Sequence, residues 1–285
     1  KISGVDPNFK MPQIWKSSIA LDWQLPVSFP LTLTGEFMFN KVVSGVTIDN
    51  INIDNTMSWK HFRGADNRLI YPSNFALNKG KNAVVLTNTN KGYGYTANIT
   101  LNAQPVRNLD IMVAYTMTES KEVSGLPGSD PVSTWQGLIT IDGPNFGTVQ
   151  RSQYVVPHRL IASVNYFLPF KIFGGKGLHL NLFYSGSSGS GYSYVYSNDM
   201  NGDGINRDLM YIPKNDSEIN FKTDADRAAF WKFVEQDKYL NTHKGEYAEA
   251  YAARSPWVHR FDLRIAEDFA FNIGNTRHNF QLVFD

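Results

Sequence analysis

The chain has 285 residues, 42% of them hydrophobic and 14% aromatic, which suffices for one large or two small domains and excludes a disordered chain. Its 27 basic and 26 acidic residues leave a formal net charge of +1, so no overall charge attracts nucleic acid, and we expect no nucleic-acid partner. Cysteine is absent, which excludes disulfides, thiolate metal sites and cysteine nucleophiles.

Three segments in the first part of the chain alternate apolar and polar residues with a period of two, which sends successive side chains to opposite faces of a sheet. Their apolar positions are Trp15, Ile19, Leu21, Trp23 and Leu25, then Leu31, Leu33, Phe37 and Phe39, then Tyr93, Tyr95, Ile99 and Leu101. Polar residues such as Lys16, Asp22 and Gln24 lie between them. We therefore predict three amphipathic strands.

The alternation continues along the rest of the chain. Its apolar positions are Leu109, Ile111, Val113, Tyr115 and Met117, then Leu160, Ala162, Val164, Tyr166 and Leu168, then Leu178, Leu180, Leu182 and Tyr184, then Trp257, Phe261, Leu263 and Ile265, then Phe280, Leu282 and Phe284. In total the sequence predicts about eight antiparallel strands of roughly the ten-residue length that crosses an outer membrane. No run approaches 18 apolar residues, so the sequence has no transmembrane helix.

The connections between these strands alternate in length. Short turns are expected at 26–30, 104–108, 169–177 and 272–277, and long loops at 43–91, 119–157 and 186–256. Outer-membrane barrels have short periplasmic turns and long external loops. The pattern therefore predicts an all-β, antiparallel transmembrane barrel, and an antiparallel sandwich with one solvent face is the alternative.

Charged residues and aromatic residues also favour the membrane interpretation. Arg260, Asp262, Arg264 and Asp268 share the polar face of one strand, where a dry core would make them costly. We expect them to face water, a plug or one another. The aromatic residues expected to form interfacial girdles are Trp15, Trp23, Tyr93, Tyr184 and Trp257. Glu267 falls on the apolar face, so we expect it near an interface.

The third long loop contains a partial calcium motif. Asp199, Asn201 and Asp203 occupy alternate positions before Gly204, as in the first half of a calcium loop. Asp208 sits at position ten, and Met210 occupies position twelve, where a bidentate glutamate would be expected. We therefore predict a calcium site made by Asp199, Asn201, Asp203 and Asp208. The alternative is that these side chains cap the backbone of their own turn.

Two neighbouring segments suggest further features of this loop. Tyr192, Tyr194 and Tyr196 alternate, so they either stack on a ligand or pack within an extended strand and its loops. From Thr223 to Leu240 the period becomes helical, with Thr223 as the cap and Phe230, Phe233 and Val234 as an apolar stripe. We expect one short external helix.

Known catalytic signatures are missing. The six histidines do not form the His-Glu-x-x-His spacing of a zinc protease, and the serines in "GSSGSG" lack the context of a nucleophile elbow. We predict that the chain is not an enzyme. A barrel enzyme with catalytic residues on separate strands is the alternative to this prediction.

Several long stretches resemble one family. "GSGYSYVYSNDMNGDGINRDLMYIP" (189–213) and "DKYLNTHKGEYAEAYAARSPWVHRFDLRIAEDF" (237–269) resemble the C-terminal barrel of TonB-dependent outer-membrane receptors, in the Oar-like group with a carboxypeptidase-regulatory-like N-terminal domain. Stretches 6–26, 90–101 and 157–166 resemble earlier strands of that barrel. The resemblance implies part of a 22-stranded barrel in a Gram-negative outer membrane, and residues 1–285 form a single region of it.

The resemblance also implies a function and partners. Such receptors import a ligand through a barrel closed by a plug, on which an inner-membrane TonB energy-coupling complex pulls. We expect contact with outer-membrane lipid and a possible surface lipoprotein, with the plug, the N-terminal domain and the final strand or strands outside the chain. The alternative functions are a complete eight-stranded barrel with a structural or adhesive role and a soluble sugar-binding sandwich.

Overall fold

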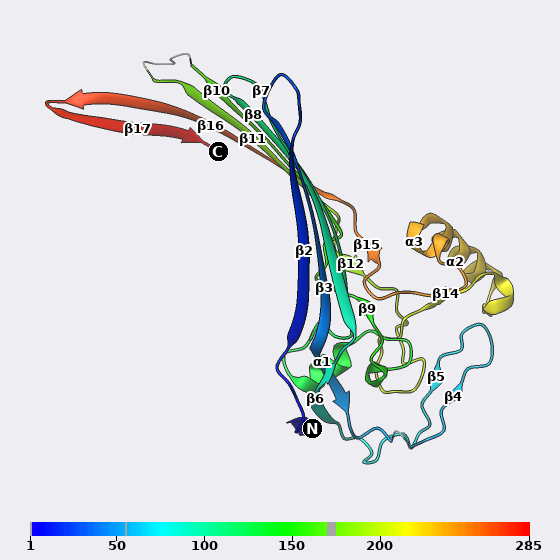
Figure 1. Cartoon of the computed structure of the whole chain (residues 1–285). Helices are drawn as coiled ribbons and strands as arrows, with labels where there is room; N and C mark the ends of the chain where they lie inside the picture. Colours follow the sequence, from blue (N-terminus) through cyan, green and yellow to red (C-terminus); the bar gives the residue numbers. More distant parts are fainter. Residues whose placement is uncertain (1, 55, 170–174) are drawn as a thin grey trace.

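The computed structural model describes residues 2–54, 56–169 and 175–285. One large curved sheet dominates it, and a body of loops and helices lies beyond one end of the sheet (Figure 1). The eight long strands of the sheet are β2 (Gln13–Gln24), β3 (Leu31–Asn50), β7 (Gly92–Val106), β8 (Leu109–Glu122), β10 (His158–Leu168), β11 (Leu178–Ser187), β16 (Val258–Ile273) and β17 (Thr276–Phe284). Each of the eight segments predicted from alternation is a strand, so the all-β class is confirmed.

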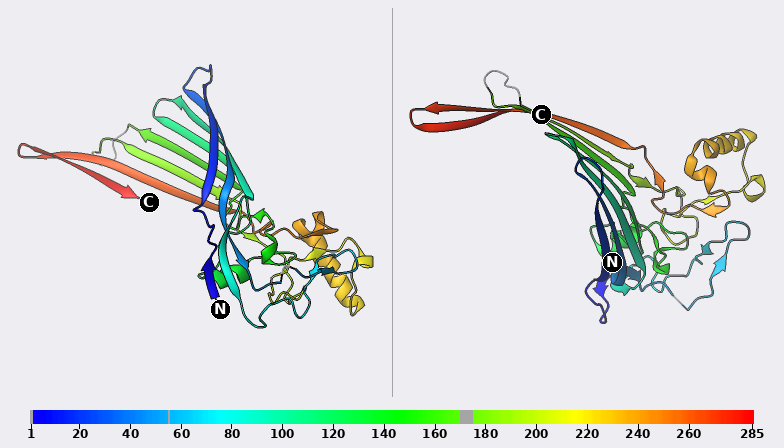
Figure 2. Two further views of the ribbon diagram at one scale, coloured as in Figure 1. Left: turned by 60° about the horizontal axis from the view of Figure 1, so that its bottom comes forward. Right: turned by 45° about the horizontal axis from the view of Figure 1, so that its top comes forward.

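The long strands pair in chain order, each antiparallel to the next. In the part of the chain that the structure describes, β2 pairs only with β3, and β17 pairs only with β16. The sheet therefore has two free edges and curves without closing (Figure 2). A closed barrel of 22 strands stays a prediction. No helix in the described ranges is long and apolar enough to span a membrane.

The turns at one end of the sheet are short, as predicted. Only Arg107 and Asn108 separate β7 from β8, and only Gly274 and Asn275 separate β16 from β17. Asn108 (φ 68°) and Gly274 (φ 61°) adopt the left-handed conformation that tight hairpins need. The predicted boundaries 104–108 and 272–277 were too wide, because the strands continue to the hairpin residues. Much of the predicted turn 169–177 lies outside the described residues.

The connections at the other end are long and carry structure of their own. β3 and β8 continue past the predicted loop starts at 43 and 119, because their ends pair with short loop strands. Those short strands are β1 (Ile2–Val5), β4 (Lys60–His61), β5 (Leu69–Ile70), β6 (Ala83–Thr89), β9 (Gln150–Arg151), β12 (Gly191–Tyr192), β13 (Tyr211–Ile212), β14 (Glu246–Tyr247) and β15 (Ala253–Arg254). The 3-10 helices are η1 (Pro144–Phe146) and η2 (Asp216–Glu218).

The prediction of one external helix was wrong in number. The loops contain α1 (Pro131–Gly137), α2 (Asp224–Gln236) and α3 (Lys238–Thr242). Thr223 caps α2 as predicted, since its hydroxyl accepts from the Asp226 amide at 3.1 Å. The helix breaks at Asp237, whose carboxylate accepts from the Leu240 amide at 2.8 Å and so starts α3.

Most of the buried core lies in the loops and in the end of β3 that extends among them. One cluster joins α1 to β3 and β6 and comprises Ile48, Ile53, Tyr71, Val84, Val132, Trp135 and Ile205. A second packs α2 and α3 against other parts of the third loop and comprises Leu209, Ile212, Val234, Leu240, Ala248 and Ala250. We call the packed loops around both clusters the external body. In the predicted apolar stripe of α2, Val234 is buried but Phe233 is exposed.

Candidate functional site

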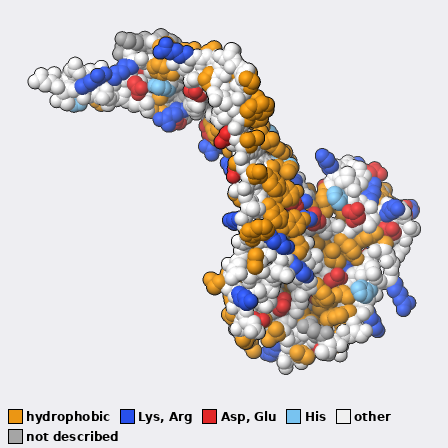
Figure 3. All heavy atoms as spheres, in the orientation of Figure 1, with side chains coloured by type: hydrophobic (Ala, Val, Ile, Leu, Met, Phe, Trp, Pro, Cys, Tyr) orange, Lys and Arg blue, Asp and Glu red, His pale blue; other side chains and the backbone are white. Residues whose placement is uncertain are grey.

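The long strands present one continuous apolar face. Cross-strand pairing places apolar side chains opposite one another along a whole row: Trp23 with Leu33, Leu33 with Leu101, Leu101 with Val113, Val113 with Ala162, Ala162 with Tyr184, and Tyr184 with Phe261. Many side chains of this face are exposed, among them Ile19 (71%), Leu21 (69%) and Leu282 (70%). Figure 3 shows hydrophobic side chains gathered along the sheet. An apolar surface of this extent marks a contact with lipid or protein.

The height of the apolar face matches a membrane. Trp15 and Trp23 bound it on β2, and the eight residue steps from one to the other span about 27 Å at roughly 3.4 Å per residue. The apolar band of an outer-membrane barrel is about 25 Å tall. Charged residues on this face lie near its ends, as Lys41 and Glu267 do. Glu267 pairs with Leu178 at the start of β11 and is buried against Gly175, and its expected place near an interface stays a prediction.

The apolar band also runs diagonally across the strands. Cross-strand pairing connects Trp23 of β2 to Phe261 of β16 along one row of the sheet. Trp15 lies eight residues before this row on β2, whereas Trp257 lies only four residues before Phe261. The aromatic limit of the band therefore moves along the strands from β2 to β16. A tilted strand in a barrel requires this kind of stagger, because its residues cross the membrane obliquely.

The opposite face is polar, and several charges of β16 on this face are paired. Arg260 and Asp262 form an ion pair at 2.9 Å, and Asp268 lies 3.1 Å from the ring of His179. Arg264 lies 3.8 Å from Asp285. These contacts agree with the expected network within the wall.

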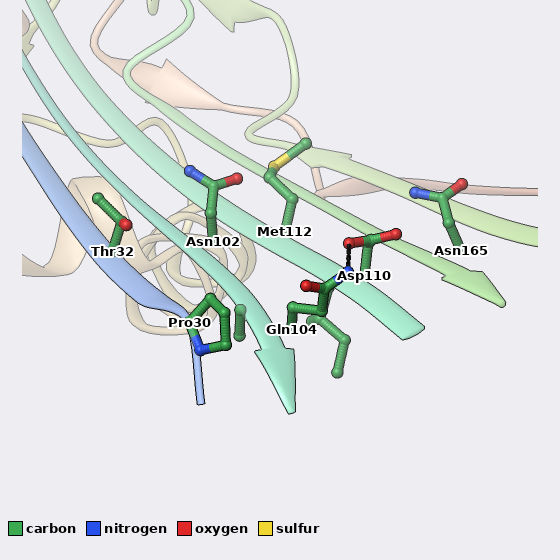
Figure 4. A pocket seen from close by; sticks show the side chains of 9 residues that line it. Pro30, Thr32, Asn102, Gln104, Asp110, Met112 and Asn165 are labelled. Atoms are coloured by element: carbon green, nitrogen blue, oxygen red, sulfur yellow. Dashed lines mark hydrogen bonds between the residues drawn. The ribbon is translucent and has the colours of Figure 1, made fainter. Parts of the chain in front are cut away.

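Shallow pockets lie on this polar face near the short turns. One, of about 410 Å³, is lined by Thr32, Asn102 and Asn165 among others, and Gln104 donates to Asp110 across its edge at 3.2 Å (Figure 4). A second, of about 480 Å³, shares Asp110 and Asn165 and extends to other polar side chains. Both are open, and each is lined by polar and apolar side chains together.

The acidic turn, residues 199–208, forms backbone caps with all four predicted calcium ligands. Asp199 accepts from the amides of Gly202 and Gly204 at 2.7 and 2.8 Å. The amides of Asp203, Ile205 and Met200 donate to Asn201, Asp203 and Asp208, respectively, at 2.9, 2.8 and 2.7 Å. This is the turn chemistry that we considered as the alternative.

The acidic turn holds two buried carboxyl groups close to a third one. Asn201 (1%), Asp203 (5%) and Asp208 (2%) are almost inaccessible. Burial, with the charges of Asp208 and Asp199, raises the pKa of Asp203 to about 7. Burial likewise raises the pKa of Asp208, and burial together with these carboxylates raises the pKa of Tyr71. Within the described ranges, no three His, Cys, Asp or Glu side chains form a group that could hold a metal ion. The calcium site stays a prediction.

The acidic turn joins the three long loops. The Tyr71 amide of the first loop donates to the Asn201 carbonyl at 2.8 Å, and the Leu209 amide donates to Thr140 of the second loop at 2.8 Å. Ile205 belongs to the first core cluster and Leu209 to the second. The turn and the residue that follows it therefore connect the two clusters.

A buried arginine supports the acidic turn and was not anticipated from the sequence. Arg68 is 1% exposed, bonds Asp66 at 2.9 Å and donates to the Leu209 carbonyl at 2.8 Å. Its guanidinium lies 5.0 and 5.4 Å from the ring centres of Tyr196 and Tyr247. The sequence around Arg68 does not predict these partners, because most of them come from another loop.

The three alternating tyrosines pack within the loops, one of the two roles that we expected. Tyr196 lies against Arg68, while Tyr194 stacks with Tyr239 of α3 at 6.2 Å and donates its hydroxyl to Asp237. Tyr192 contacts Tyr194 edge to face at 5.6 Å.

Comparison of the chain with protein-family models, curated proteins and solved structures finds no match.

Proposed function

We propose that this chain is the wall of a transmembrane β-barrel in the outer membrane of a Gram-negative bacterium, with the external body on the cell surface. The observation that carries the proposal is the exposed apolar face, which is continuous over eight paired strands. Its height and its diagonal course fit a tilted barrel in lipid. The alternation of short turns and long, folded loops supports the same orientation.

We further propose that the barrel is a TonB-dependent transporter that imports a ligand, and that the chain is not an enzyme. The two free edges of the sheet leave room for more strands, up to the 22 that the family resemblance implies. The polar face, with Arg260, Asp262 and the two open pockets, would then surround water and a plug. The plug would connect the barrel to the inner-membrane energy-coupling complex.

The mass of the native polypeptide tests this proposal. The membrane fraction of the source cells is extracted with detergent, and the intact mass is compared with the 32.2 kDa of the present residues. A mass several-fold larger supports the transporter. A membrane protein near 32.2 kDa would replace import with a structural or adhesive small barrel, and recovery without detergent would refute the membrane location.

A further inference from the structure

A row of aromatic and histidine rings crosses the apolar face at the end that meets the external body. Its six members come from β8, β10, β11, the start of β16 and the residue just before it, and they are Tyr115, His158, Trp257, His259, Tyr184 and Phe261. Successive ring centres lie 6.1, 6.5, 6.2, 6.1 and 4.9 Å apart in that order. We call this set the ring row.

Both histidines of the ring row are held in the same way. The Tyr115 hydroxyl lies 2.7 Å from Nδ1 of His158, and the Tyr184 hydroxyl lies 2.9 Å from Nδ1 of His259. Gly186, opposite His259, leaves room for the Tyr184 ring, since a Cβ there would meet the tyrosine hydroxyl. Each tyrosine therefore fixes one ring nitrogen and leaves Nε2 for a partner outside the described residues.

A cation lies at the same end of the apolar face. Lys41 is exposed between Trp15 and Tyr93, its cross-strand neighbours. No carboxylate among residues 2–54, 56–169 and 175–285 forms an ion pair with it. Glu119, farther along this face, is engaged by Arg151 at 3.0 Å. The polar groups at this end thus include a cation and the two Nε2 atoms of His158 and His259.

The opposite end of the face differs. Glu267 is buried there, and His278 lies against the ring of Phe271 at 5.9 Å. His278 has no tyrosine partner of the kind that orients the two histidines of the ring row, within the contacts of the described chain. The apolar face is therefore chemically asymmetric from one end to the other.

We infer that Lys41, between Trp15 and Tyr93, and the two histidines of the ring row bind anionic phosphate headgroups of the outer leaflet. The inference rests on the proposed function, because it needs the apolar face to lie in lipid. Aromatic rings favour the depth of the headgroups, and the ammonium and imidazole N–H groups donate to phosphate oxygens. The donors lie at the edge of the apolar face, which the acyl chains would cover. A lipid is therefore favoured over a free phosphate ion.

Lipid retention by the full-length polypeptide tests the inference. The purified protein in a non-ionic detergent is mixed with equal amounts of phosphatidic acid and phosphatidylcholine, and native mass spectrometry measures the ratio retained. We expect phosphatidic acid to be enriched. Lys41→Gln should lower this ratio roughly fivefold, the effect of one basic side chain near an anionic surface. Adding His158→Phe and His259→Phe, which keep the rings, should lower it further.

Controls separate the possible outcomes. His278→Phe removes a histidine from the other end of the same face and should leave the ratio unchanged. An unchanged ratio of retained phosphatidic acid to phosphatidylcholine in both Lys41→Gln and the triple variant would overturn the inference. An equal loss of this ratio in His278→Phe, or displacement of the lipid by inorganic phosphate, would also overturn it. If the wild-type protein retains both lipids equally, only the headgroup inference fails. If it retains neither, the proposed membrane wall fails as well.

Discussion

An arginine placed on the apolar face should reveal whether that face lies in lipid. Val164 is central in β10, between Ile111 and Leu182, and is 36% exposed. In lipid, Val164→Arg should cost about 2–4 kcal/mol, the penalty of arginine near the bilayer midplane. At about 1.4 kcal/mol per tenfold, this lowers the folding equilibrium constant roughly 30- to 700-fold. If this face lay in water, the same substitution should change the free energy of unfolding by about 0.5 kcal/mol or less.

The neighbouring residue supplies the matched control. Ser163 lies on the same strand but on the polar face, where it pairs with Met112 and Phe183. The full-length protein is refolded into phospholipid vesicles, and its free energy of unfolding is measured by urea titration. We expect a loss of about 2–4 kcal/mol for Val164→Arg and a much smaller one for Ser163→Arg. Equal losses, or a loss confined to Ser163→Arg, would refute the assignment of the two faces.

Four further predictions concern the external body. Burial raises the pKa of Asp203 to about 7, so the stability that its neutral form contributes is complete below about pH 4 and falls by up to about 4 kcal/mol as the pH rises to 7. Urea titration monitored by tryptophan fluorescence should show this slope in the free energy of unfolding, and Asp203→Asn should flatten it. Calcium at pH 8 should slow tryptic cleavage after exposed Arg207, and an unchanged rate would contradict the calcium site. Gly143→Ala should cost about 1–3 kcal/mol in the same titration, since Gly143 has φ 100° and a Cβ would meet the Tyr71 hydroxyl; no change would mean that the loop adjusts freely. Leu240→Ala empties a fully buried position and should cost about 2–5 kcal/mol, so a near-neutral effect would place the second cluster outside the cooperative core.

The long strands were predictable because their information is local. Alternation along segments such as 160–168 needs only the period of a strand and a difference between two faces. The registers confirm the inference, since Val164 meets Leu182 and Ile111 on the apolar face while Asn165 meets Asn181 and Asp110 on the other. The hairpins were predictable in place but not in length, because pairing extends each strand until a residue such as Gly274 reverses the chain.

The external body was less predictable because its partners are distant in sequence. α1 is a seven-residue helix fixed by the Asp130 cap and by burial of Trp135 against another loop, so its periodicity was too short to detect. The split between α2 and α3 depends on Asp237, whose carboxylate caps α3. The sequence pattern alone does not distinguish Asp237 from an ordinary helical residue. Arg68 could not be predicted as buried, because Leu209, which accepts its hydrogen bond, lies in another loop.

The acidic turn shows why a half-matched motif can still identify an important position. Its side chains follow calcium-loop spacing, yet each supplies a hydrogen bond that shapes the turn itself. The turn must place Ile205 in one core cluster and Leu209 in the other, which fixes its backbone tightly. The resulting burial of Asp203 and Asp208 is unfavourable for their charged forms, and the raised pKa values record that conflict. A proton or a divalent cation would relieve it, so the stability of the external body should depend on whichever of the two is present.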